Sequence, residues 1–156
     1  MPDQTPEEAI AAIQKKGGRV ERDDKAPGKP LTVVNLATTG AADEDLKPIE
    51  GMSTITKLTL NNCKVTDAGL EKLKGLSGLK KLYLVDTKIT DAGLAHLKEL
   101  KALEVLSLVG TEVTDAGLEH LKGLENLKEV FLHGSKVTDE GVKKWKEALP
   151  KLKVDR

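Results

Sequence analysis

Hydrolysis by a catalytic triad needs a serine, a histidine and an aspartate, and the best candidates in this sequence are Ser107, His133 and Asp86. In a catalytic triad the histidine accepts the serine proton and the carboxylate orients the histidine. Ser107 lies in Leu-Ser-Leu-Val, which lacks the Gly-x-Ser-x-Gly turn of a nucleophilic serine, and no neighbouring residue activates it. We therefore predict that the chain is not an enzyme, and a hydrolase that uses Ser107 and His133 is a remote alternative.

Metal ligands and reactive thiols are sparse. Cys63 is the only cysteine, so no disulfide forms within the chain and a Cys/His zinc site would need three scattered histidines. His96 and His120 are 24 residues apart, but the residues at the flanking equivalent positions are Lys72 and Lys144, so no third ligand follows. We predict an interior Cys63, two solvated histidines and no metal or cofactor.

An acidic series and a basic series recur with the same spacing. Their members are Asp43, Asp67, Asp91, Asp115 and Asp139, and Lys74, Lys98, Lys122 and Lys146. No glycine-rich calcium-binding repeat accompanies the aspartates, which disfavours a calcium site. Acidic residues at helix starts and basic residues at helix ends are favoured by the helix dipole, so we expect both series to be structural.

The overall charge is balanced, with 25 Lys and Arg residues against 25 Asp and Glu residues. No net field therefore draws the chain to nucleic acid or to an anionic membrane. No apolar stretch approaches the roughly 18–20 residues of a membrane span, and the polar residues 1–8 are unlike a signal peptide. We expect a soluble protein, either cytoplasmic or exported after loss of a leader that is not present in this chain.

A 24-residue repeat accounts for most of the chain and must position these side chains. Numbered from Leu31, its first, fourth and sixth columns are aliphatic in all five copies: Leu31, Ile55, Leu79, Leu103 and Leu127; Val34, Leu58, Leu82, Leu106 and Val130; Leu36, Leu60, Leu84, Leu108 and Leu132. Thr-Asp-Ala-Gly-Leu recurs unchanged at 66–70, 90–94 and 114–118. A fixed period of this length predicts a solenoid, in which each unit buries its apolar face against its neighbours.

Residues 79–102 show the expected course of one unit. Leu82 and Leu84 alternate with polar positions, as in a strand with one buried face. Thr90 or Asp91 then caps a short helix, whose inner face carries Leu94 and Leu97. Helices are wider than strands, so the stack should bend into a short, right-handed α/β horseshoe with a parallel sheet on its concave face. The Thr, Cys or Ser of column nine should point inward and bond loop backbone, and the glycine column at 69, 93, 117 and 141 should mark tight contact between units.

These columns resemble the leucine-rich repeat family over residues 31–150. The similarity is closest to a bacterial subtype that reads Leu-x-x-Leu-x-Leu-x-x-Thr-x-Val-Thr-Asp-Ala-Gly-Leu, which is related to cysteine-containing, ribonuclease-inhibitor-like repeats. The chain carries Thr where plant and animal receptors carry Asn, and it lacks their cysteine-rich caps and the box of a ubiquitin-ligase adaptor. The resemblance implies a scaffold for protein binding without naming the partner.

The two ends depart from the repeat in the manner of caps. Thr5-Pro6-Glu7-Glu8 predicts the capped start of a helix, and residues 19–23 a short edge strand. Trp145 replaces a leucine and should cover the last unit, and Val154 falls in column four of a sixth strand. We predict a capping helix and loop over 1–30, five repeats over 31–150 and a capping strand over 151–156, together a complete small solenoid.

Columns three, five, seven and eight are left free by the scaffold on the outer surface of the sheet, and we call this surface the sheet face. The only Tyr and the only Phe of the chain lie there. The candidate protein-binding residues are Tyr83, Val85, Val105, Ser107, Val109, Phe131 and His133. An apolar patch with aromatic anchors and a polar rim is typical of an interface, although such pairs also stabilise sheets.

The area of this face limits its partner. Five strands give roughly 480 Å², less than the ~800 Å² that each partner contributes to a standard interface. We therefore expect a non-catalytic, monomeric module that binds a peptide or a protein loop. A structural spacer or a self-association module, such as a weak homodimer, is the alternative.

Overall fold

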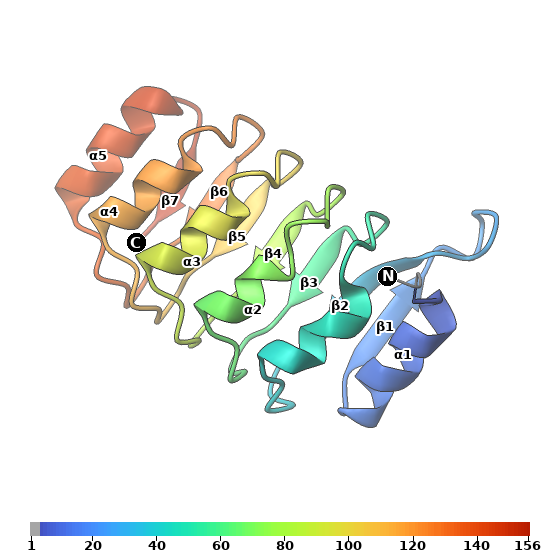
Figure 1. Cartoon of the computed structure of the whole chain (residues 1–156). Coiled ribbons are helices and arrows are strands. Elements are labelled where there is room, and N and C mark those ends of the chain that lie inside the picture. The colour runs from blue at the N-terminus through green and yellow to red at the C-terminus, as the bar shows by residue number, and fades with distance from the viewer. Residues whose placement is uncertain (1–3) are drawn as a thin grey trace.

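The computed structural model describes residues 4–156 as a stack of βα coils, with a sheet along one side and helices along the other (Figure 1). Within this range the strands are β1 (Arg19–Arg22), β2 (Leu31–Asn35), β3 (Lys57–Thr59), β4 (Lys81–Tyr83), β5 (Val105–Ser107), β6 (Glu129–Phe131) and β7 (Lys153–Asp155). The α-helices are α1 (Pro6–Lys15), α2 (Asp67–Glu71), α3 (Asp91–Leu94), α4 (Asp115–Leu118) and α5 (Asp139–Ala148). The 3-10 helices are η1 (Asp43–Ile49), η2 (Ala95–Leu97) and η3 (Glu119–Leu121). The first three residues of the cap predicted over 1–30 lie outside the described part.

The strands pair in sequence order, and the repeat columns pair in register. The β1–β2 pair is antiparallel, and every later pair is parallel. Column four gives one continuous row across the sheet: Val34, Leu58, Leu82, Leu106, Val130 and Val154. The aliphatic columns are buried together in one core. The predicted solenoid is therefore confirmed, because each leucine meets its equivalent in the next coil.

Small polar side chains of column nine donate to carbonyl groups in the turns that follow β2, β4 and β5. Thr87 Oγ1 donates to the Leu84 carbonyl at 2.7 Å, and Thr111 Oγ1 donates to the Leu108 carbonyl at 2.7 Å. The Cys63 thiol donates to the Leu36 carbonyl at 3.0 Å. The predicted interior role is thus confirmed for Cys63, Thr87 and Thr111, which are buried and bond loop backbone. The Leu36 and Leu108 carbonyls also accept the backbone N–H three residues on, at 3.2 Å each, so the side chain adds a second bond there.

The aspartate column does more than complement a helix dipole. Each of the first four aspartates accepts two bonds from the threonine that opens the next helix along the stack. For Asp91 these come from Thr114 N at 2.7 Å and Thr114 Oγ1 at 2.6 Å, and the other pairs are Asp43 with Thr66, Asp67 with Thr90, and Asp115 with Thr138. The prediction that Thr90 or Asp91 caps its own helix is wrong for α3, because both side chains bond between coils.

The glycine column makes room for these carboxylates. A Cβ on Gly141 would lie within 2.8 Å of Asp115 Oδ2 and closer still to Oδ1, and the other three glycines of the column meet the preceding aspartate in the same way. The first repeat has no coil before it that supplies such a carboxylate. It accordingly carries Ala42 and Asp45 where later repeats carry Thr and Gly, and Asp45 bonds the Ala42 N–H at 2.8 Å.

The N-terminal cap is held by local bonds that the sequence predicted. Thr5 Oγ1 accepts the Glu8 N–H at 3.3 Å, and Glu8 Oε2 accepts the Thr5 N–H at 3.1 Å. Helix α1 ends before Gly17, whose φ of 92° needs a glycine. The β1 strand then adds the antiparallel edge, and it ends one residue earlier than predicted.

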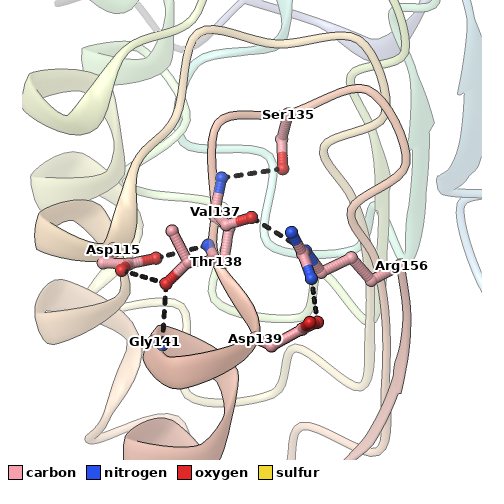
Figure 2. Close-up of polar contacts among 7 residues, drawn as sticks. All are labelled: Asp115, Ser135, Val137, Thr138, Asp139, Gly141 and Arg156. Atoms are coloured by element: carbon pink, nitrogen blue, oxygen red, sulfur yellow. Dashed lines mark hydrogen bonds and ion pairs between the residues drawn. The ribbon is translucent and has the colours of Figure 1, made fainter.

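At the other end, α5 covers the last repeat and β7 adds the final described strand. Trp145 is 1% exposed, as expected for a covering residue. Arg156 donates to the Val137 carbonyl at 2.8 Å and pairs with Asp139, the one aspartate of its column that has no following threonine (Figure 2). Figure 2 also shows the last Asp–Thr contact, between Asp115 and Thr138.

Candidate interface on the sheet face

The two aromatic residues lie on one row of the sheet face, with Ser107 between them. Tyr83 pairs with Ser107 in register, and Ser107 pairs with Phe131 on the next strand. Ser107 is only 3% exposed, whereas Tyr83 and Phe131 are partly exposed. Neither aromatic side chain belongs to the buried core. The row therefore has two protruding aromatic side chains with the small, buried Ser107 between them.

The predicted valines surround this row. Val105 on β5 lies two positions before Ser107, and Val109 lies two positions after it, so both share its face of the sheet. Val85 holds the equivalent place after Tyr83. All three are partly exposed. Tyr83, Phe131 and the three valines thus form one apolar patch, which we call the aromatic patch.

His133 belongs to the rim of this patch and has a partner that the sequence prediction missed. Its Nε2 lies 2.7 Å from Asp155 Oδ1, and both side chains are more than half exposed. Ser107 and His133 form no hydrogen bond with each other in the described residues. With Val154 in column four, Asp155 falls in column five beside Phe131, but its contact with His133 joins different columns of neighbouring strands and was therefore missed.

The N-terminal half of the sheet face has a different character. Lys57 Nζ lies 5.7 Å from the centre of the Tyr83 ring, a cation–π distance. Beside it, Arg19, Val20, Glu21, Val33, Asn35, Lys57 and Thr59 line a hollow of about 280 Å³ between β1 and β3. The hollow was missed from the sequence, because an antiparallel β1 had no column in the repeat to predict its register.

The turns after the strands form a rim with unusual backbone angles. Asn62 and Asp86 have φ values of 56° and 53°, and Gly110 and Gly134 take the same left-handed conformation at the equivalent positions. This conformation costs little for glycine and is tolerated by Asn and Asp. The backbone of the rim therefore has the same shape in each coil, while its side chains differ from coil to coil.

The remaining candidate chemical groups are the Cys63 thiol and the possible metal ligands. Burial raises the pKa of the Cys63 thiol, which disfavours the reactive thiolate. Among residues 4–156 no group of three His, Cys, Asp or Glu side chains is placed to hold a metal ion.

Over the same residues, no helix has the length and apolarity that a bilayer crossing requires.

These features define a class of protein: a solenoid of in-register βα coils with one free sheet face. The profile of the family described as Leucine Rich repeat matches residues 51–74. The chain therefore has the fold of a leucine-rich repeat solenoid, as its columns predicted. The bacterial Thr-Asp-Ala-Gly-Leu subtype stays a prediction.

Several solved structures share this fold. An internalin (inlF) from Listeria monocytogenes is 26% identical with a TM-score of 0.61 over 70% of this chain, which spans only 30% of that internalin. The ectodomain of the receptor kinase SOBIR1 from Arabidopsis thaliana is 16% identical with a TM-score of 0.62, over 98% of this chain and 91% of that chain.

A third similar structure is the ectodomain of the receptor kinase GASSHO1/SCHENGEN3 from Arabidopsis thaliana, solved in complex with CASPARIAN STRIP INTEGRITY FACTOR 2. It is 16% identical with a TM-score of 0.59, over 86% of this chain and 16% of that chain. At such identity the two plant receptors show a common fold alone. A search of curated proteins finds no match.

Proposed function

We propose that this chain is a non-catalytic module that binds a peptide or a protein loop on its sheet face. The observation that carries the proposal is the aromatic patch: Tyr83 and Phe131 stand partly exposed on one row, with valines around them. Exposed aromatic residues at the centre of a patch are the usual anchors of protein interfaces. A leucine-rich repeat ectodomain solved with a bound factor supports the use of this architecture as a binding platform.

A catalytic role for the same face has less support. His133 bonds Asp155 rather than Ser107, so no serine–histidine pair is assembled in the described residues. The Ser107 side chain is almost fully buried, which leaves it little access to a substrate. These two observations favour binding over hydrolysis.

The test is a pair of substitutions that place lysines in the patch, Tyr83→Lys with Phe131→Lys. Both side chains lie outside the core, so we expect the fold to persist while capture of partner proteins from the native host is lost. A matched control, Ala68→Lys with Ala116→Lys, adds the same two charges at exposed positions of α2 and α4. Capture that survives the patch variant would refute the proposal.

Light scattering on the same variants separates partner binding from self-association. If the patch mediates a homodimer, the mass in solution falls when Tyr83 and Phe131 become lysines. If it binds another protein, wild type and variant have the same mass while only wild type captures a partner.

A further inference from the structure

We infer that the hollow between β1 and β3 recognises an acidic side chain, so that the partner is a peptide or loop with an Asp or Glu close to an apolar anchor. This inference deepens the proposed function and rests on it. It names the chemistry of the partner, which the aromatic patch alone leaves open.

The first argument is an excess of unpaired cations. Arg19 and Lys57 line the hollow, and Lys81 stands directly opposite Lys57 on the next strand. Within residues 4–156, none of the three has a carboxylate within ion-pair distance. Glu21 is the only acidic residue that lines the hollow, so its walls keep one positive charge in excess.

Like charges directly opposite each other on neighbouring strands destabilise a sheet. The Lys57–Lys81 pair therefore costs folding free energy that a neutral residue at either position would avoid. An anionic group placed between the two ammonium groups offsets this repulsion. The retention of two opposed lysines is thus explained if an acidic partner neutralises them on binding.

The second argument is the orientation of the asparagine amides. Asn35 Oδ1 accepts the Ala37 N–H at 2.9 Å, and Asn61 Oδ1 accepts the Val85 N–H at 3.0 Å. Because these bonds hold the oxygens against the backbone, the amide NH2 groups are left as donors. Asn35 and Thr59 line the hollow together with Arg19 and Lys57, so four of its lining side chains carry hydrogen-bond donors. Such a set of donors suits a carboxylate, which only accepts hydrogen bonds.

The third argument is continuity with the aromatic patch. Lys57 lines the hollow and also lies 5.7 Å from the Tyr83 ring, so one side chain belongs to both. From β2, at the centre of the hollow, to Tyr83 on β4 is two strand spacings, or roughly 10 Å, which an extended peptide covers in about three residues. The expected partner therefore carries Asp or Glu about three residues from an aliphatic or aromatic side chain.

Selection of a random 12-residue phage-displayed library on the immobilised chain tests the inference. We expect the selected peptides to share this spacing. Synthetic labelled copies, measured by fluorescence polarisation, should lose at least tenfold in affinity when Glu is changed to Gln. They should lose at least as much on Arg19→Glu with Lys57→Glu, and bind more weakly as salt is raised.

Charge reversal on both sides gives the sharpest result. A peptide with Glu changed to Lys should bind the Arg19→Glu, Lys57→Glu variant better than it binds wild type. A control with the same charge change at exposed positions elsewhere, Lys98→Glu with Lys151→Glu, should bind the original peptide like wild type. Thermal melts of all variants show whether each is folded.

The outcomes separate the two proposals. Peptides that require Tyr83 and Phe131 but bind the Arg19→Glu, Lys57→Glu variant like wild type overturn the acidic-partner inference and leave the proposed function standing. Peptides that are indifferent to both pairs, or a selection that yields no binder, overturn both.

Discussion

Substitutions at Asp115 and Gly141 should reveal that the two positions are coupled between coils. Asp115→Ala removes the acceptor for Thr138 N at 2.7 Å and for Thr138 Oγ1 at 2.6 Å. Bonds to a charged group contribute about 1.5–3 kcal/mol each. Thr138 is exposed, so water recovers part of this loss. We expect the single change to lower the free energy of unfolding by about 1–3 kcal/mol, or roughly 3–10 °C in Tm for a chain of this size.

Gly141→Ala alone should be destabilising for a different reason. Its new Cβ would overlap both oxygens of the Asp115 carboxylate, and relieving such a clash typically costs about 1–3 kcal/mol. In the Asp115→Ala background the clash is gone. Alanine is then favoured over glycine in a helix by about 0.5–1 kcal/mol, so Gly141→Ala should become neutral or stabilising. The effect of one substitution thus changes sign with the other.

Thermal and urea unfolding of the wild type, both single variants and the double variant measure this coupling. Asp139→Ala is the matched control, since it lies in the same column but has only an exposed pairing with Arg156. It should leave Tm within about 2 °C of wild type. Strictly additive effects of the Asp115 and Gly141 changes would refute the steric account of the glycine column.

Three further predictions concern the core, the pH dependence of stability and the thiol. Leu84→Ala empties a fully buried position and should cost about 2–5 kcal/mol, seen as a lower urea midpoint; a loss below 1 kcal/mol would contradict the packing described. The hydrogen bond from the Thr138 hydroxyl lowers the pKa of Asp115, so the stabilisation it gives is present above the ordinary pKa near 3.8 and is lost as pH falls through the lower pKa of the folded state. Asp115→Asn should therefore lose less stability in acid than wild type does. Parallel plots of unfolding free energy against pH for the two proteins would refute this. Because burial raises the pKa of the Cys63 thiol, a thiol reagent should label it far more slowly in the native than in the unfolded chain, and equal rates would place Cys63 outside the core.

The strands and the core could be predicted because they follow from repetition alone. A 24-residue spacing of aliphatic residues brings Leu58, Leu82 and Leu106 into one row, and the sheet pairs them in that register. The aromatic residues also fell on the expected face, since column five alternates with the buried columns. Contacts between residues of the same column in neighbouring repeats could therefore be predicted from the sequence.

Contacts between different columns were harder to predict. Asp67 was assigned to the dipole of its own helix, but its oxygens bond Thr90 in the next coil, 23 residues later. That pairing depends on the angle between helices once the coils stack. The hollow was missed because the antiparallel β1 lies outside the five repeats, where no column fixes its register. The His133–Asp155 pair was missed because it joins column seven of one unit to column five of the next.

The bonds that four aspartates accept from the threonine 23 residues ahead have a consequence for how such a chain can grow. An inserted copy of residues 79–102 would bring its own aspartate and its own threonine, so both new junctions would be complete at once. The number of repeats can therefore change while the two caps stay the same. A sixth coil would widen the sheet face by one strand, and with it the area of the proposed interface.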